Sequence, residues 1–374
     1  MKILTIVGTR PEIIRLSRVI PLLDKYVDHV LVHTGQNYDY ELNEIFFKDL
    51  ELRAPDYFLN VDTTSLGKAV GEIFSKSEEV LLKEKPDALL VLGDTNSCLA
   101  AYMAKRLRIP IYHMEAGNRC FDFNVPEEIN RRIIDHIADF NLVSTEHARR
   151  HLVSEGLPHR RIYLTGSPMF EVLNFYADKI EKSTILNDLS IESAKYFMVS
   201  IHREENVDNQ PNLKNIISIL NNLAENYHLP VIVSTHPRTR NRMEKLNNVK
   251  IDKSIQFLKP FGFTDYVCLQ KNALCTVSDS GTISEESAIL SFPAISLRNS
   301  MERPEAMDAG TIVLTGFDYQ TVINSINTVI QEHKEKKYDS IPEEYRVSNT
   351  SWRVLKLILG TTKLSNKWHG ISDS

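Results

Sequence analysis

The sequence predicts an α/β protein made of two Rossmann-like domains, each built on a parallel sheet. Three observations support this class. The chain has 374 residues, which is more than one ordinary hydrophobic core accommodates. Short apolar runs alternate with amphipathic stretches along its whole length, as in doubly wound sheets. The runs are continuously apolar, which is typical of strands covered by helices on both faces.

The expected strands and helices alternate in each half of the chain. In the first half we expect strands at 3–7, 29–33, 88–92, 110–113, 140–143 and 162–165, with helices at 11–26, 66–84, 97–107 and 126–137. In the second half we expect strands at 196–201, 230–234, 254–258, 274–278, 294–297 and 311–314, with helices at 212–225, 238–246, 284–290 and 319–336.

The expected linker is the polar stretch 179–193, which lacks a strong period. This predicts an N-terminal domain at 1–180 and a C-terminal domain at 190–349. Residues 350–374 are expected to pack back on the first domain, with a frayed end from residue 365. Because open α/β sheets bind ligands beyond the carboxyl ends of their strands, we expect the site in a cleft that the two domains face.

Charge and composition exclude several kinds of partner. The formal net charge is -5, which argues against a nucleic acid and against an anionic membrane surface. The opening MKILTIVG is expected to be a strand rather than a secretion signal, and no apolar stretch is long enough to span a membrane. The four cysteines form no C-x-x-C pair, so we expect reduced thiols, a cytoplasmic protein and no metal.

Two strand ends lead into turns that favour an anion. Gly8 to Glu12 reads GTRPE, where a helix start and the charge of Arg10 favour phosphate, although a plain turn with a solvated arginine is the alternative. The segment 278–286 reads SDSGTISEE. Its Ser280, Gly281 and Thr282 are expected to contact a diphosphate and its Glu286 a ribose, although Asp279 or Ser280 acting only as a helix cap is the alternative.

Three acids follow expected strands or begin a helix in the first half. They are Asp94, Glu115 and Glu127, with Arg131 one turn after Glu127. Acids at one sheet edge should repel one another, which would raise some pKa values as acid–base chemistry requires. The alternative for each alone is a surface charge. The shared placement favours the site, most of all for Asp94 and Glu115.

Two histidines follow strands in the second half. His202 is a candidate for stabilising a leaving phosphate, and His236 is equally well explained by a structural hydrogen bond. His33, His113 and His136 are expected to be structural. The sequence contains neither G-x-G-x-x-G nor G-x-x-x-x-G-K-[ST], so neither hydride transfer nor ATP hydrolysis is indicated.

Taken together, these segments resemble the non-hydrolysing UDP-N-acetylglucosamine 2-epimerase family along nearly the whole chain. The matching strings are GTRPE at 8–12, GDT at 93–95, HMEAG at 113–117, PEEINR at 126–131, HREEN at 202–206, SDSGTISEE at 278–286 and ERPEAMDAGT at 302–311. The resemblance implies a glycosyltransferase B-type fold, a homodimer, a UDP-2-acetamido sugar as substrate, and no metal or nicotinamide cofactor.

The resemblance also implies a mechanism and a role for each matched residue. A base removes the C2 proton while UDP leaves C1, and UDP then adds back after inversion at C2. Asp94, Glu115 and Glu127 match the acid–base carboxylates, Arg131 an active-site arginine, and His202 the group that stabilises departing UDP. The expected UDP contacts are Arg10, Arg15, His236, Ser280, Gly281, Thr282 and Glu286.

Several positions depart from the usual family pattern. Arg15 replaces a lysine, Glu204 an arginine and Thr282 a glycine, and 36–40 reads QNYDY where some members bind an activating UDP-sugar. These variants, with NRCFD at 118–122, are most similar to the capsule and O-antigen branch, which converts UDP-2-acetamido-2,6-dideoxy-L-talose to UDP-N-acetyl-L-fucosamine. The alternatives are epimerisation of UDP-N-acetylglucosamine to UDP-N-acetylmannosamine, and a glycosyltransferase of the same architecture.

Overall fold

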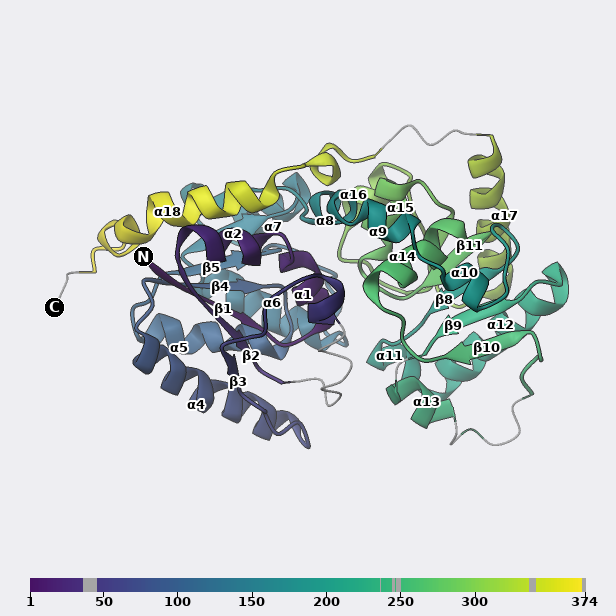
Figure 1. Cartoon of the computed structure of the whole chain (residues 1–374), viewed down its shortest axis with the longest axis horizontal. Coiled ribbons are helices and arrows are strands. Elements are labelled where there is room, and N and C mark those ends of the chain that lie inside the picture. Colours follow the sequence, from purple (N-terminus) through teal and green to yellow (C-terminus); the bar gives the residue numbers. More distant parts are fainter. Residues whose placement is uncertain (36–45, 236, 244–245, 247–249, 336–340, 372–374) are drawn as a thin grey trace. The chain divides into compact units, whose positions relative to one another are not determined.

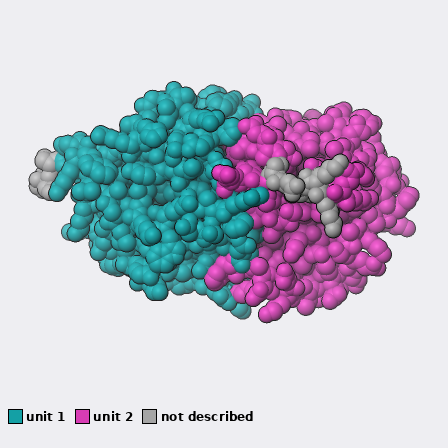
Figure 2. All heavy atoms as spheres, turned by 90° about the horizontal axis from the view of Figure 1, so that it is seen from above, with its two compact units in different colours: residues 1–174, 344–374 teal, residues 175–343 magenta. Residues whose placement is uncertain are grey.

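The computed structural model describes two compact units of the chain. The described residues are 1–35, 46–235, 237–243, 246, 250–335 and 341–371. Unit 1 comprises residues 1–174 and 344–374, and unit 2 comprises residues 175–343 (Figure 2). Among the described residues, no helix has the length and apolar character needed to cross a membrane.

Unit 1 is built on a seven-stranded parallel sheet in the order β3-β2-β1-β4-β5-β6-β7 (Figure 1). Every strand expected in this half is present. The two-residue β3 was not predicted, because a strand so short shows no period. The bounds are β1 Lys2–Val7, β2 Asp28–His33, β3 Tyr57–Phe58, β4 Ala88–Leu92, β5 Ile111–Met114, β6 Phe140–Val143 and β7 Ile162–Leu164.

Unit 2 contains a six-stranded parallel sheet in the order β10-β9-β8-β11-β12-β13. All of its strands were predicted, so the expectation of two parallel α/β sheets is confirmed. The bounds are β8 Phe197–Ser200, β9 Val231–Ser234, β10 Ile255–Leu258, β11 Cys275–Ser278, β12 Ala294–Ser296 and β13 Val313–Leu314.

The helices of unit 1 differ from prediction at residues 11–26, which form two helices rather than one. Pro21 explains the break, because it has no N–H to donate to the carbonyl of Ser17, whereas the first turn of a new helix tolerates it. The helices are α1 Arg10–Leu16, α2 Val19–Tyr26, α4 Leu66–Glu84, α5 Ala100–Arg106, α6 Pro126–Ile137, α7 Glu146–Ser154 and α8 Met169–Phe175, with short 3-10 helices at Asn96–Leu99 and His159–Arg161.

The C-terminal helix α18, Thr350–Trp368, belongs to unit 1 and lies along α2 (Figure 1). The rings of Trp352 and Tyr26 have their centroids 5.4 Å apart. The hydroxyl of Tyr112 lies 2.7 Å from the Thr361 hydroxyl. The expectation of a frayed end from residue 365 is wrong for residues 365–368, because Ser365 is fully buried and the ring of Trp368 lies 6.2 Å from that of Phe140.

Unit 2 begins with two short helices, which occupy much of the stretch 179–193 where the sequence suggests a linker. The helices of this unit are α9 Ala177–Glu181, α10 Ile185–Asp188, α11 Glu204–Val207, α12 Gln210–Tyr227, α13 Pro237–Met243, α14 Phe263–Asn272, α15 Ile283–Leu290, α16 Pro304–Asp308 and α17 Tyr319–Lys334. A 3-10 helix at Glu343–Arg346 follows, where the chain returns to unit 1.

The strand order of each sheet defines where a ligand would bind. In unit 1, β1 lies between β2 and β4, and in unit 2, β8 lies between β9 and β11. These are topological switch points, where loops leave neighbouring strands in opposite directions and open a crevice at their carboxyl ends. The residues that follow β1 and β4, and those that follow β8 and β11, are the ones that the sequence marks as functional.

Candidate active site

The turn after β1 in unit 1 is tightly packed around Gly8. A Cβ on Gly8 would lie 1.8 Å from Oγ of Ser97 and 2.2 Å from Oγ1 of Thr34, so the ends of three strands meet where only glycine fits. The following residues begin α1, with Thr9 as the N-cap. The guanidinium of Arg10 lies over the ring of Phe46, 5.3 Å from its centroid.

Glu12 is a buried acid beneath this turn. Its Oε2 accepts hydrogen bonds from the amides of Gly8 and Thr9, both at 2.7 Å, and its Oε1 accepts one from the Thr95 hydroxyl at 2.8 Å. Burial raises the pKa of Glu12 to about 7, although these hydrogen bonds act to lower it. Glu12 was not predicted to have a role of its own, although a glutamate three residues after a threonine cap is the sequence pattern of a capping box.

Asp94 follows β4 and is held by α6. Its Oδ2 accepts two hydrogen bonds from Arg131, from Nε at 3.1 Å and from Nη2 at 2.6 Å. The Asn130 side chain donates to the backbone carbonyl of Asp94 at 2.9 Å. Arg131 is buried, whereas the Asp94 side chain is 30% exposed, so the carboxylate remains accessible to a ligand.

Glu115 follows β5, the strand adjacent to β4. Its φ is 61°, a left-handed conformation that is costly for a residue with a side chain and that recurs at functional sites. Its carboxylate forms an ion pair with Arg15 of α1. A Cβ added to Gly93, directly before Asp94, would lie 3.6 Å from Oε2 of Glu115, so Glu115 reaches the loop that carries Asp94.

The ion pairs of Asp94 and Glu115 correct one expectation. The sequence suggested acids that repel one another, but an arginine offsets the charge of each, Arg131 for Asp94 and Arg15 for Glu115. Repulsion between the acids does not dominate, because α1 and α6 place an arginine beside each carboxylate at the sheet edge. Arg15, expected as a UDP contact, forms an ion pair with the carboxylate of Glu115.

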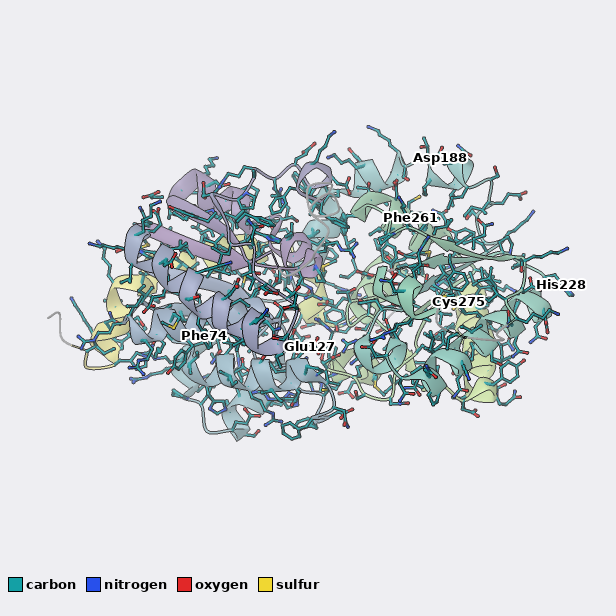
Figure 3. All side chains as sticks on the ribbon, turned by 90° about the horizontal axis from the view of Figure 1, so that it is seen from below. Phe74, Glu127, Asp188, His228, Phe261 and Cys275 are labelled. Carbon is teal, nitrogen blue, oxygen red and sulfur yellow. The ribbon has the colours of Figure 1, made fainter. Side chains whose placement is uncertain are left out.

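Glu127 lies in the first turn of α6, one turn before Arg131, and is half-buried (Figure 3). Its neighbour Glu128 is fully buried and accepts hydrogen bonds from Arg131 at 3.1 Å and from Arg132 at 2.9 Å. Burial acts to raise the pKa of Glu128, but the Cys120 amide and these arginines lower it below its usual range. Glu128 was missed, although its spacing of three and four residues from two arginines could have indicated it.

In unit 2, the buried Asp279 connects the ends of β8 and β11. Its carboxylate accepts hydrogen bonds from the amides of His202 at 3.1 Å and Arg203 at 3.0 Å, and from the Asn206 side chain at 2.8 Å. Helix α15 begins directly after Thr282, and the Ser280 hydroxyl accepts a hydrogen bond from the Thr282 amide at 3.3 Å, so the alternative of a capping role for Ser280 stays open. The His202 side chain is 44% exposed, with Nδ1 3.3 Å from Oδ1 of Asp279.

The loop before α15 presents small polar groups. The hydroxyls of Ser280 and Thr282 lie 3.0 Å apart. A Cβ on Gly281 would lie 3.5 Å from Nη2 of Arg203 and 3.6 Å from Oε2 of Glu302. Two hydroxyls and a guanidinium therefore gather at a helix start, a combination that suits an anion.

Of two further predicted UDP contacts, Glu286 lies within the described residues and His236 does not. Glu286 is 6% exposed, and its Oε2 accepts a hydrogen bond from Gln270 at 2.7 Å. Burial raises the pKa of the Tyr266 hydroxyl, and the negative charge of nearby Glu286 raises it further. His236 lies outside the described residues, as do residues 36–40.

The sequence did not predict the buried ion-pair network beside the loop that precedes α15. Glu302 accepts two hydrogen bonds from Arg298, at 2.5 and 2.7 Å, and one from Arg203 at 3.0 Å. Arg303 pairs with Glu285 at 2.8 Å. Arg203 and Glu285 lie far along the chain from Glu302 and Arg303, so no local pattern indicates those two pairs. The four-residue spacing of Arg298 and Glu302 falls in no expected helix.

Each unit thus carries charged and polar side chains at the switch point of a parallel sheet. Unit 1 has arginine-paired carboxylates, and unit 2 has a hydroxyl-bearing helix start next to an arginine. This combination defines a class: α/β enzymes that act on phosphate-bearing substrates through carboxylate chemistry.

Comparison with known proteins identifies the family within this class. A profile of the UDP-N-acetylglucosamine 2-epimerase family matches residues 23–359. The structure of UDP-N-acetylglucosamine 2-epimerase from Rickettsia bellii is 48% identical, covers 99% of each chain and superposes with a TM-score of 0.92. The UDP-GlcNAc 2-epimerase of Methanocaldococcus jannaschii, in complex with UDP-GlcNAc and UDP, is 36% identical over 96% of this chain and 99% of that one, with a TM-score of 0.90.

A third relative is the UDP-2,3-diacetamido-2,3-dideoxy-D-glucuronate 2-epimerase of Pseudomonas aeruginosa, 34% identical over 333 residues, which are 88% of this chain and 92% of that protein. The chain belongs to the UDP-N-acetylglucosamine 2-epimerase family. The prediction of an isomerase that acts on UDP-sugars is thereby confirmed.

Proposed function

We propose that the chain is a non-hydrolysing epimerase that inverts C2 of a UDP-2-acetamido sugar by eliminating and re-adding UDP. The observation that carries the proposal is the pair of arginine-held carboxylates, Asp94 and Glu115, at the ends of neighbouring strands. A single base is insufficient, because inversion removes a proton from one face of C2 and returns one to the other.

The elimination step balances without an oxidant. A carboxylate of unit 1 takes the C2 proton, the electrons of that C–H bond form the C1–C2 double bond, and the C1–O bond breaks with its electrons on UDP. In the return step a UDP oxygen attacks C1, and a second acid protonates C2 on the opposite face. Asp94, Glu115 and Glu127 are the acid–base groups in this proposal, and Arg131 holds Asp94 in place.

The nucleotide contacts are assigned mainly to unit 2. Ser280, Gly281 and Thr282 bind the diphosphate and Glu286 the ribose, in keeping with their places around the start of α15. The half-exposed His202 stabilises the departing UDP. Arg10 and His236 complete the UDP contacts, while Arg15 acts through its ion pair with Glu115.

Two substrates are candidates, and each has its own support. The sequence variants at Arg15, Glu204, Thr282 and 118–122 support UDP-2-acetamido-2,6-dideoxy-L-talose, the precursor of UDP-N-acetyl-L-fucosamine in surface polysaccharides. The relatives named for UDP-N-acetylglucosamine support its conversion to UDP-N-acetylmannosamine. The C2 inversion is the same for both sugars, which differ in configuration at C3 and C5 and in the 6-deoxy group. The resemblance also supports a homodimer, which sedimentation equilibrium would measure.

The decisive experiment is incubation with each UDP-sugar alone in deuterated water, followed by NMR. The proposal predicts deuterium at C2 of a UDP-linked product, and the preferred sugar is the one with the higher kcat/KM. Product only after an acceptor is added would indicate a glycosyltransferase, and release of free sugar would indicate a hydrolysing enzyme. Either result contradicts the proposal.

Asp94→Asn should lower the rate of deuterium uptake by about a hundredfold or more, because one acid–base group is lost. Asp188→Asn, at an exposed position of α10, is the matched control and should leave the rate unchanged (Figure 3).

A further inference from the structure

We propose that Glu12 and Thr95 form a brace that positions Asp94 for proton transfer. The proposal rests on the function assigned above to Asp94. Glu12 and Thr95 are 83 residues apart in the chain, and their side chains meet in a hydrogen bond of 2.8 Å. Thr95 is the residue that directly follows Asp94, so this bond fixes the backbone that carries the candidate base.

Helix capping alone does not account for Glu12. A capping glutamate needs one oxygen for the amide of the cap residue, and Oε2 of Glu12 serves that purpose for Thr9 at 2.7 Å. Its other oxygen is directed to Thr95, and the side chain is only 2% exposed. Burying a carboxyl group is costly unless its hydrogen-bonding capacity is used, and here both oxygens are used.

The loop of Asp94 is restrained on both sides. Gly93 has a φ of 76°, a left-handed turn that brings the chain off β4. Thr95 then begins the 3-10 helix Asn96–Leu99 as its N-cap. Asn130 of α6 donates a hydrogen bond to the Asp94 carbonyl at 2.9 Å. Glu12 of α1 accepts one from Thr95, so a different helix restrains each side of the loop.

Helix α1 thereby serves both candidate carboxylates. Glu12, in its first turn, acts on Asp94 through Thr95, and Arg15, in its last turn, pairs with Glu115. One rigid helix therefore sets the positions of the two acids relative to each other. Displacement of a reacting group by about 1 Å can cost about a hundredfold in rate, so such a brace would act on turnover rather than on nucleotide binding.

The test compares Thr95→Val, which keeps the shape and removes the hydroxyl, with Thr95→Ser, which keeps the hydroxyl. For Thr95→Val we expect kcat and the rate of C2 deuterium uptake to fall by about tenfold to a hundredfold. The calorimetric Kd for UDP should change by less than about twofold, because the diphosphate contacts are on other residues. Thr95→Ser should recover at least about half of the wild-type kcat.

A normal kcat for Thr95→Val would overturn the brace, and so would a Thr95→Ser variant as slow as Thr95→Val. The melting temperature of each variant excludes unfolding as the cause. Glu12→Gln provides a second test, because it removes one acceptor from the same bond. If the two residues act through one bond, the double variant should be no slower than the slower single variant, whereas multiplied losses would contradict the proposal.

Failure of the brace and failure of the proposed function give different results. If Asp94→Asn abolishes deuterium uptake and Thr95→Val does not slow it, only the brace is wrong. If Asp94→Asn is fully active, the role of Asp94 itself is wrong, and the brace with it.

Discussion

At the scale of single residues, the candidate acids are defined by their partners. Arg131 is buried and contacts both Asp94 and Glu128 with different nitrogens of its guanidinium. A lysine carries the same charge but has one nitrogen, so it cannot make both contacts in this fork geometry. The acid–base role of Asp94 therefore depends on a specific arginine.

Arg131→Lys should lower kcat by about tenfold or more, with a smaller change in KM, because a lysine cannot replace the two guanidinium N–H groups that donate to Oδ2 of Asp94. Arg132→Lys is the matched control, since Arg132 also contacts Glu128 but has Glu155 rather than Asp94 as its second carboxylate partner. Steady-state kinetics of both variants measures the difference. Equal losses in the two variants would mean that the effect comes through Glu128 rather than through Asp94.

Glu12 also makes stability depend on pH. Its pKa is raised from 4.5 to about 7, so between these values the folded chain binds a proton that the unfolded chain has released. The contribution of Glu12 to the free energy of unfolding therefore falls as pH rises through this window, by about 3 kcal/mol for a shift of this size. Glu12→Gln removes the titrating group, so the wild type should lose about 3 kcal/mol more than the variant between about pH 5 and pH 8.

Urea unfolding at the two pH values measures this difference. His33, whose pKa burial lowers to about 4, acts in the opposite direction, since its contribution falls as pH drops below 6.5. It is present in both proteins and cancels in the comparison. If the free energy of unfolding changed with pH equally for wild type and Glu12→Gln, the pKa of Glu12 would not be raised in the folded chain.

At the scale of elements, the loop between β5 and α6 depends on close packing against α7. Gly117 has a φ of 81°, and a Cβ on it would lie 2.4 Å from the carbonyl oxygen of Ala148. Backbone atoms cannot move aside as a flexible side chain can, so the loop requires glycine. The same loop leads from Glu115 to Glu127, so its shape also affects the site.

Gly117→Ala should lower the free energy of unfolding by about 2–3 kcal/mol, through the clash and the left-handed backbone. Gly71→Ala is the control, because nothing lies within 4 Å of a Cβ at this position in α4. It should raise stability by about 1 kcal/mol, since alanine favours a helix interior. Urea unfolding measures both, and a stable Gly117→Ala would contradict the packing argument.

Helices and strands were predicted where their apolar periodicity is strong and missed where it is weak. Long apolar runs and helices such as α4 and α12 were predicted, because each buries a regular stripe of side chains. Helix α7 was not, because it is mostly polar and buries only Ala148 and Leu152. Residues 11–26 were predicted to form a single helix because their apolar period continues through Pro21. The missing N–H of Pro21 interrupts the helical hydrogen bonds, so the segment forms α1 and α2.

At the scale of the whole molecule, the two ends of the chain form one unit. Residues 344–374 belong to unit 1 with residues 1–174, and α18 packs on α2. Ile358 of α18 is fully buried, whereas the next residue, Leu359, is 43% exposed. The return of the chain should therefore stabilise the unit that carries the carboxylates.

Ile358→Ala should destabilise unit 1 by about 2–5 kcal/mol, the usual cost of a cavity in a packed core. Leu359→Ala is the matched control and should cost less than about 1 kcal/mol, since its side chain is already partly in water. Thermal unfolding compares the two variants. Equal effects would mean that α18 does not contribute to the core of this unit.

The sequence by itself determined the two parallel sheets, the family resemblance and the positions of polar residues at strand ends. These features depend on local periodicity and on where each strand stops, which neighbouring residues encode. Only the tertiary structure decided that Arg15 pairs with Glu115, 100 residues away, and that Glu12 reaches Thr95, 83 residues away. A local pattern specifies which face of an element is buried, but the partner on that face depends on how distant segments pack together.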